Sequence, residues 1–324
     1  MKHLLLTAAL SGLSLASAQT APSNLSGTLT LYTSEVQADV QAQVDAFKQR
    51  YPKVDVQLFR SGTGEVTAKL NAELEAGNPQ ADLLWVADQT YFDTLSKRNL
   101  LEKLNLIGLK VPASAVYGDT SAEVRKLYNV IGVNTNVLKT IPKSFADLKL
   151  PAYQNKLAMP NPLFSGGALS TAGTLAQQLS WDYFGALAKN GMKIEQSNPI
   201  TTTKLINGEY GAALLVDYAL RREMAKGAPI EVVYPSEGAI LVPTPIGVLK
   251  SSKHKALAQA FVRFLYSPTA QANFAKLSYV PVMPGAPRPA GVPASIPTLP
   301  SAAAYIATNK AEIGQRFSAL FDLK

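Results

Sequence analysis

The feature that most constrains the fold is an alternation of short β-rich runs with helical patterns, which occurs twice along the chain. The strand candidates are "TLTLYT" (28–33), "VDVQLFR" (54–60) and "DLLWVA" (82–87), then "NVIGVN" (129–134), "KLAMPN" (156–161), "AALLVD" (212–217) and "EVVYP" (231–235). This alternation predicts βαβ units and mostly parallel sheets. We therefore expect an α/β protein with two lobes, joined by hinge strands, and a ligand cleft between the lobes.

The last part of the chain has a different pattern. Apolar residues at helical spacing predict two successive helices within 255–277, separated at Ser267-Pro268. Residues 280–300 are rich in proline, which favours an extended segment that crosses the molecule. A final helix is expected over residues 302–321.

The N-terminus is typical of a secretory signal peptide. Lys2 precedes the apolar run "LLLTAALSGLSLASA", and Ala16-Ser17-Ala18 supplies a site of small residues for cleavage. We expect residues 1–18 to be removed, which leaves a soluble periplasmic or extracytoplasmic protein. No later stretch approaches the roughly 20 apolar residues of a membrane span.

Composition excludes several classes of site. The chain has no cysteine, so disulfides and thiolate metal sites are excluded. The net charge of +8 becomes +7 without the signal peptide, which carries only Lys2 (8 − 1 = 7). Its basic clusters, at 221–226 and 250–255, do not interleave with aromatic residues, so we expect no nucleic-acid partner. The positive charge favours anionic solutes.

Catalysis has little support in the residues. Of the two histidines, His3 lies in the signal peptide and His254 in a lysine-rich stretch, so a Ser-His-Asp triad has no good base. The chain has no Walker A lysine and no G-x-S-x-G motif. A secreted enzyme that uses paired carboxylates stays an alternative, but no pair stands out, and we expect a protein that is not an enzyme and has no cofactor.

Three loops combine a strand end, small polar residues and a helix start. They contribute Ser165-Gly166-Gly167-Ala168, then Ser61-Gly62-Thr63, and then Thr33 and Ser34. Free N–H groups and the positive end of the helix dipole make such a terminus an anion site. Each loop taken singly can also be an ordinary helix cap. Together they place hydroxyl and N–H donors at the carboxyl ends of strands, where α/β sheets bind ligands.

Two further loops are candidates for the same cleft. Asp88 and Tyr91 follow the strand that ends near residue 86, and Asp217 and Tyr218 follow "ALLV". The alternatives are that Asp217 caps a helix and that both tyrosines are packed rings with their hydroxyl groups at the surface. If they face the cleft, the aspartates can balance a positively charged group of a ligand, and carboxylate and phenolate oxygens can bind a hard trivalent metal.

The chain resembles the periplasmic solute-binding proteins of ABC importers. The subgroup is the one that holds ferric-iron, 2-aminoethylphosphonate, thiamine and hexose-phosphate binders. The resemblance rests on "LTLYTSEVQADVQAQVDAFKQRYP", "FRSGTGEVTAKLNAE", "PQADLLWVADQTYFDTL", "MPNPLFSGGALSTAG", "IEVVYPSEGAILVPTPIGVLK" and "FVRFLYSPTAQANFAKLSYVPV". The resemblance extends over nearly the whole mature chain, and it rests on the order and spacing of these segments rather than on one motif.

The resemblance implies a type II periplasmic binding protein with two hinge crossings, near 127–133 and 233–243, and closure over ligand. Lobe 1 is then expected to comprise residues 19–128 and 236–284, and lobe 2 residues 129–235 and 285–324. The implied partner is an ABC permease in the membrane, and we expect the receptor to be a monomer.

Ferric iron is the alternative ligand. Iron binders of this subgroup commonly use two adjacent tyrosines where this chain has Asp217-Tyr218, and the histidine that some take from the first strand loop is absent here. The candidate iron ligands are Tyr218, Tyr91 or Tyr32, with Asp88 and Asp217. An anion such as carbonate or phosphate would then occupy Ser165 to Ala168.

The leading interpretation is a receptor for a phosphonate or phosphate ester. In that interpretation the anion is bound by Thr33, Ser34, Ser61, Gly62, Thr63 and the loop from Ser165 through Gly166 and Gly167 to Ala168. Asp88 and Asp217 balance a positive group, and Tyr218 packs or bonds across the cleft.

Overall fold

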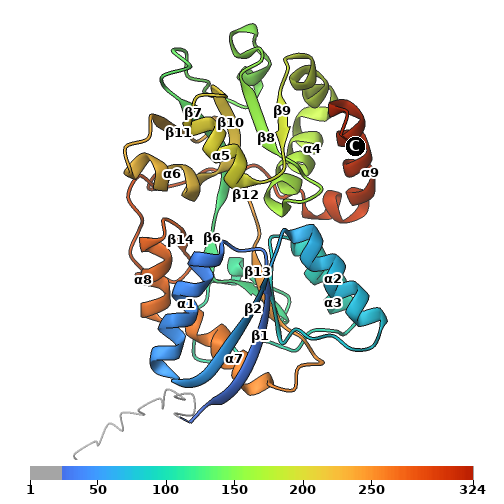
Figure 1. The fold of residues 1–324 in the computed structure, drawn as a ribbon, viewed down its shortest axis with the longest axis vertical. Coiled ribbons are helices and arrows are strands. Elements are labelled where there is room, and N and C mark those ends of the chain that lie inside the picture. Colours follow the sequence, from blue (N-terminus) through green and yellow to red (C-terminus); the bar gives the residue numbers. More distant parts are fainter. Residues whose placement is uncertain (1–23, 324) are drawn as a thin grey trace, which may run out of the picture.

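The computed structural model describes residues 24–323 and has two lobes, one above the other in Figure 1. The lower lobe contains the N-terminal part of the chain and returns in orange, while the upper lobe contains the green, yellow and red segments. The predicted two-lobed α/β fold is confirmed. The predicted signal peptide, 1–18, lies outside the described residues.

Lobe 1 is built on a six-stranded sheet with the strand order β2-β1-β3-β13-β5-β4. These strands are β1 (Ser26–Thr33), β2 (Lys53–Arg60), β3 (Leu83–Trp85), β4 (Val116–Tyr117), β5 (Ser121–Glu123) and β13 (Pro245–Val248). The helices of the lobe are α1 (Gln37–Arg50), α2 (Thr63–Glu75), α3 (Gln89–Lys97), α7 (Lys255–Leu265) and α8 (Pro268–Lys276), with a short 3-10 helix at Ala113–Ala115.

Lobe 2 is built on the strand order β11-β7-β10-β8-β9, with β12 also paired to β7. The strands are β7 (Tyr128–Asn134), β8 (Leu157–Pro160), β9 (Lys193–Glu195), β10 (Ala212–Val216), β11 (Ile230–Val233) and β12 (Ile240–Leu241). The helices are α4 (Gly166–Lys189), α5 (Asn198–Ile206), α6 (Asp217–Ala225) and α9 (Ala303–Phe321), with 3-10 turns at Ala146–Lys149 and Pro151–Tyr153.

The central strands of lobe 2 are apolar throughout because helices cover both faces of the sheet. In β10, Leu214 packs in the cluster that contains α4 and α9, whereas Leu215 packs in the cluster with α5 and α6. Every residue of β10 is buried as a result. The carboxyl end of this strand is therefore held firmly at the cleft.

The sheets are mixed, whereas the sequence predicted mostly parallel ones. β1 pairs in parallel with β2 and β3, and β8 in parallel with β9 and β10. β7 and β13 run antiparallel to their neighbours. Because β7 and β13 each follow a crossing between the lobes, each begins at the cleft. The parallel strands of the same sheets end at the cleft, so β7 and β13 run in the opposite direction.

Three segments connect the lobes. The first passes from β5 through β6 (Arg125–Lys126) to β7, and the second lies between β12 and β13 at residues 242–244. The third follows β14 (Val280–Pro281), which pairs with β6, and leads to α9. The proline-rich segment is thus the predicted crossing. Because β12 pairs with β7, residues 240–241 belong to the sheet of lobe 2, beyond the predicted boundary at 236.

Candidate functional site

A cavity of about 320 Å³ lies between the lobes. Lobe 1 contributes residues 34–36 and 60–63, and lobe 2 contributes 164–167 and 196–199 together with Val216 and Tyr218. The cavity faces the carboxyl ends of β1, β2, β8, β9 and β10, as the topology of an α/β protein requires. This cavity is the candidate ligand cleft.

Five helices begin at the cleft. The residue before the first turn is Val36 in α1, Gly62 in α2, Ser165 in α4, Ser197 in α5 and Val216 in α6, and all five line the cavity. The first N–H groups of a helix have no partner within the helix. Of these five residues at the cleft, Ser165 alone caps its helix with a side chain. The cleft therefore has a strongly positive backbone surface.

In the first loop of lobe 1, Ser34 lines the cleft while Thr33 supports it from behind. Thr33 is fully buried, and its hydroxyl group donates to the Trp85 carbonyl at 2.8 Å and accepts from the Glu35 amide at 3.1 Å. The Ser34 hydroxyl accepts from the Ala87 amide at 3.2 Å. Thr33 therefore shapes the loop and does not itself reach a ligand.

The second loop of lobe 1 brings Ser61, Gly62 and Thr63 to the cleft. The Ser61 hydroxyl donates to the Glu65 carboxylate, one turn into α2. Thr63 is buried, and it lies beside Gly166 of the other lobe. Its hydroxyl group is thus placed where the two lobes meet.

The loop before α4 contributes Ser165, Gly166 and Gly167 to the cleft. The Ser165 hydroxyl accepts from the Ala168 amide at 3.3 Å and from the Asn198 side chain at 3.1 Å. Ala168, expected to bind the anion, is buried and does not line the cavity, and its amide donates to the Ser165 cap. The other two positions keep the backbone accessible, since glycine has no side chain to cover it.

The two lobes are in direct contact beside the cavity. A Cβ atom added to Gly166 would lie 1.9 Å from the Ala87 carbonyl oxygen, and one added to Gly62 would lie 2.9 Å from the Phe164 carbonyl oxygen. Each contact joins lobe 1 to lobe 2. We call this arrangement, in which backbone of the two lobes is in contact at the edge of the cleft, the closed form.

The two aspartates do not occupy the positions expected from the sequence. Asp88 begins α3, where it accepts from the Tyr91 amide at 3.1 Å and from Lys310 at 2.6 Å. It lines a second interlobe cavity of about 250 Å³ rather than the cleft. The expectation that it faces the cleft is wrong because a lysine of this chain already balances its charge.

Asp217 is fully buried below the cleft. It accepts from the Tyr128 amide at 3.0 Å, from Arg221 at 2.5 Å and from the Tyr234 hydroxyl at 3.2 Å. The expectation that Asp217 faces a ligand is also wrong: its carboxylate joins α6 to β7 and is paired with arginine.

Of the three tyrosines considered for iron, Tyr218 alone lines the cleft. Its ring lies 4.2 Å from that of Tyr279, centroid to centroid, and burial raises the pKa of its hydroxyl group. The Tyr91 hydroxyl donates to Asn71 at 2.7 Å and the Tyr32 hydroxyl to Glu73 at 2.7 Å, both away from the cavity. No group of three or more His, Asp or Glu side chains among residues 24–323 could hold a metal ion.

The cleft also contains polar residues that the sequence did not single out. Arg60 is the last residue of β2, and its guanidinium donates to the Glu35 carbonyl at 3.0 Å. Glu35 itself forms a buried ion pair with Arg125 of the first crossing. Gln196 and Asn198 flank the start of α5, after a strand of three residues that is too short to detect. The proline that follows, Pro199, is a helix-start signal that could have revealed this loop.

Comparison with known proteins places the chain in a family. The family described as bacterial extracellular solute-binding protein matches residues 42–300. A putative 2-aminoethylphosphonate-binding periplasmic protein of Salmonella typhi is 25% identical over 283 residues, which cover 80% of each chain. The major ferric iron-binding protein of Neisseria meningitidis serogroup A is 27% identical over 274 residues, which cover 79% of this chain and 81% of that protein.

Among solved structures, the periplasmic binding protein AfuA from Actinobacillus pleuropneumoniae, with fructose-6-phosphate bound, has the same fold. Its TM-score is 0.82 at 22% sequence identity, and the match covers 92% of this chain and 99% of that one.

The two-lobed fold and the interlobe cleft define a solute receptor, and the chain belongs to the family of bacterial extracellular solute-binding proteins. It is related to a putative 2-aminoethylphosphonate-binding protein and to ferric iron-binding proteins, and it shares the fold of AfuA. Proteins of this family are not catalytic and serve ABC importers, so the expectation that the chain is not an enzyme is confirmed. Within residues 24–323, no helix has the length and apolar character needed to cross a membrane.

Proposed function

We propose that this protein captures a phosphate ester or a phosphonate in its cleft, in the periplasm, and delivers it to an ABC permease. The observation that carries the proposal is the convergence of five helix N-termini on one cavity, four of them without a side-chain cap. A phosphoryl group has several acceptor oxygens and negative charge, which match N–H donors and helix dipoles.

The donors that support this proposal come from both lobes. Ser34, Ser61 and Thr63 belong to lobe 1, and Ser165 with the backbone of Gly166 and Gly167 to lobe 2. Arg60 adds a positive charge at the rim. Because one chain supplies all of these groups, we expect the receptor to act as a monomer, with the two lobes moving about the three crossings.

The paired aspartates favour a ligand without an ammonium group. Asp88 is bonded to Lys310 and Asp217 to Arg221, so neither is available to a positively charged solute. Of the carboxylates that line the cleft, Glu35 is paired with Arg125, which leaves Glu65. We therefore rank phosphate esters of neutral alcohols above aminophosphonates.

Ferric iron is the second candidate, because Tyr218 lines the cleft and a phenolate is a good iron ligand. It ranks lower because Tyr91 and Tyr32 bond elsewhere and both aspartates are paired. Of the candidate protein ligands for iron, only Tyr218 would therefore be available in the cleft.

A thermal-shift panel tests the proposal. Ligand-free protein is heated with phosphate esters, phosphonates, sulfate and ferric nitrilotriacetate, since a ligand at 100 times its Kd stabilises the folded state by about 2.7 kcal/mol. We expect stabilisation by a phosphorylated solute. Stabilisation by iron alone, with a tyrosinate absorption band that Tyr218→Phe removes, would overturn the proposal.

A pair of matched variants locates the ligand. Ser165 and Ser267 both cap a helix through a hydroxyl group that accepts an amide at 3.3 Å, but only Ser165 lines the cleft. Each change to alanine should cost roughly 1 kcal/mol of folding free energy. Ser165→Ala should in addition weaken phosphoryl binding about tenfold, or 1.4 kcal/mol, whereas Ser267→Ala should leave it unchanged. Equal affinity in both variants would exclude Ser165 from the site.

A further inference from the structure

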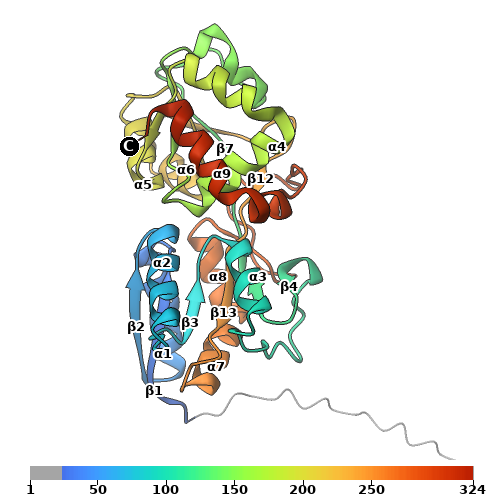
Figure 2. The same cartoon turned by 90° about the vertical axis from the view of Figure 1, so that its right-hand side faces the viewer.

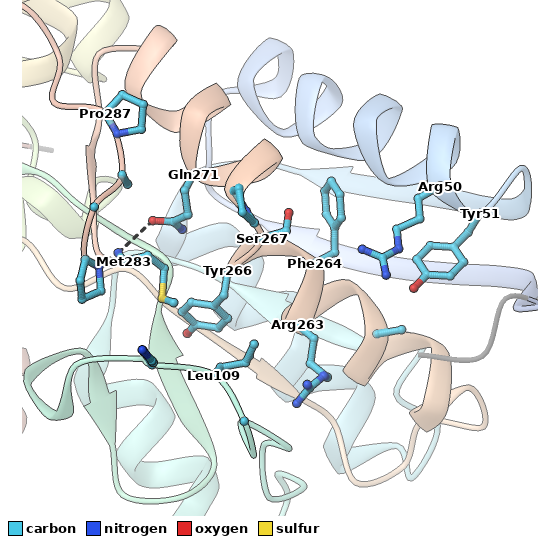
Figure 3. Close-up of a pocket in the computed structure, with 17 residues that line it drawn as sticks. Arg50, Tyr51, Leu109, Arg263, Phe264, Tyr266, Ser267, Gln271, Met283 and Pro287 are labelled. Atoms are coloured by element: carbon cyan, nitrogen blue, oxygen red, sulfur yellow. Dashed lines mark hydrogen bonds between the residues drawn. The ribbon is translucent and has the colours of Figure 1, made fainter. Parts of the chain in front are cut away.

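A separate groove lies on lobe 1, away from both interlobe cavities, and it shares no lining residue with the cleft. Its volume is about 600 Å³, which is within the range of small-molecule sites. We call it the basic groove. It is lined by the end of α1, by α7, by the start of α8 and by segments 108–110 and 283–287. Figure 3 shows Arg50 and Tyr51 on one side of the groove and Met283 and Pro287 on the other.

The floor of the basic groove is apolar and its polar atoms are already bonded. Phe264 and Met283 line this floor, and the side chain of Phe264 is mostly buried. Gln271 donates to the Val124 and Leu265 carbonyls at 2.8 Å each and accepts from the Met283 amide at 3.1 Å. The Tyr266 hydroxyl donates to the Glu123 carbonyl at 3.0 Å. Because these groups need no water, the floor favours an apolar occupant.

The charge around the groove has one sign. Arg50, Lys110 and Arg263 line it, and no Asp or Glu does. None of the three forms an ion pair with a carboxylate anywhere in residues 24–323. Arg263 uses one nitrogen to bond the Asn105 and Ile107 carbonyls, at 2.7 and 3.0 Å. Its remaining donors, with those of Arg50, can hold a carboxylate.

We propose that the basic groove binds a small amphiphilic carboxylate, with its apolar body on Phe264 and Met283 and its carboxylate between Arg50, Lys110 and Arg263. This inference is independent of the solute in the cleft. The apolar floor and the three cations without carboxylate partners are complementary to such a molecule. A neutral or positively charged amphiphile could contact the apolar floor but has no negative charge to pair with the three cations.

The methionines provide a local test. The chain has five, at positions 1, 159, 192, 224 and 283. Protein labelled with ¹³C at the methionine methyl groups is titrated with octanoate, and with octanol as the uncharged control. We expect the Met283 resonance to shift saturably with octanoate, while Met159 and Met192, buried in lobe 2, stay unchanged. No shift at Met283, or an equal shift with octanol, would overturn the proposal.

A charge reversal completes the test. Arg50 and Lys110 are exposed, so the double variant Arg50→Glu, Lys110→Glu should fold normally. We expect its affinity for octanoate to fall at least tenfold. Lys253→Glu, an exposed lysine outside the groove, is the matched control and should bind as the unmodified protein does. Unchanged affinity in the double variant would contradict the assigned role of the cations.

Discussion

At the scale of single residues, Gly166 decides whether the lobes can close. Its Cα faces the Ala87 carbonyl of the other lobe so closely that a Cβ atom would lie 1.9 Å from the carbonyl oxygen. Both partners are backbone, so no side chain can move aside. An open form, with the lobes apart, would not bring these two groups together.

Gly166→Ala should therefore fold but fail to close. We expect ligand affinity to fall at least tenfold, about 1.4 kcal/mol, with the melting temperature of ligand-free protein changed little. Gly185→Ala is the matched control, because Gly185 also lies in α4 and an added Cβ meets nothing within 4 Å. Calorimetric titration of both variants measures the difference. Full affinity in Gly166→Ala would contradict a closed state with this interlobe contact.

Glu123 controls a second property, the pH dependence of stability. It is fully buried in β5, neither carboxylate oxygen has a hydrogen-bond partner among the described residues, and burial raises its pKa from 4.5 to about 7. A raised native pKa means that the folded state holds the proton more tightly. The resulting stabilisation is complete below pH 4.5, the unfolded value, and is lost as the pH rises to about 7.

Glu123→Gln should remove that pH dependence. For the unmodified protein, this group should lower the free energy of unfolding by about 3 kcal/mol between pH 4.5 and pH 8. Denaturant titrations across this range, with the exposed Glu312→Gln as control, measure the difference. If the variant and the unmodified protein show the same pH profile, the carboxyl group of Glu123 does not titrate in this range.

At the scale of elements, the sequence predicted the strands and loops that local pattern determines. The seven predicted strand runs coincide with β1, β2, β3, β7, β8, β10 and β11. It missed β5 and β13, which pair with each other although they lie more than 100 residues apart, and the start of α5. Three helix N-termini at the cleft were predicted and five are present. The direction of the Asp88 side chain depends on Lys310, 222 residues away, which no local pattern connects with it. Asp217 pairs with Arg221 at the i,i+4 spacing of a helix, a signal that is present in the sequence.

The contact between α9 and α3 is an interlobe element that the sequence did not reveal. In Figure 2, the first turns of α9 lie above α3, and Lys310 of α9 bonds Asp88 at the start of α3. The lysine is half exposed, so its contribution is small, at most about 1 kcal/mol. Because it joins the two lobes, that energy favours the closed form.

Lys310→Met should increase the rate of ligand dissociation about threefold, which is within the energy of a partly exposed ion pair. Stopped-flow release measures this rate. Arg316→Met is a control on the same helix, since Arg316 pairs with Glu312 within α9 and not across the lobes. A release rate equal to that of the unmodified protein would show that the ion pair does not stabilise closure.

At the scale of the whole molecule, the fold combines two lobes with three crossings. The ligand cleft lies between the lobes, and five strands direct helix N-termini into it. The positive charge of the chain, +8 overall, adds a long-range preference for anions. Local N–H donors and net charge thus favour the same class of solute.

The proposed function depends on recognition of a phosphoryl group in the cleft. The most direct measurement is calorimetric titration with phosphate esters and the matching alcohols, such as glycerol 3-phosphate with glycerol and glucose 6-phosphate with glucose. We expect at least one ester to bind with a Kd in the micromolar range or below, and at least 100-fold (about 2.7 kcal/mol) more tightly than its alcohol. Equal affinity for ester and alcohol, or binding of ferric iron alone, would contradict the proposed function.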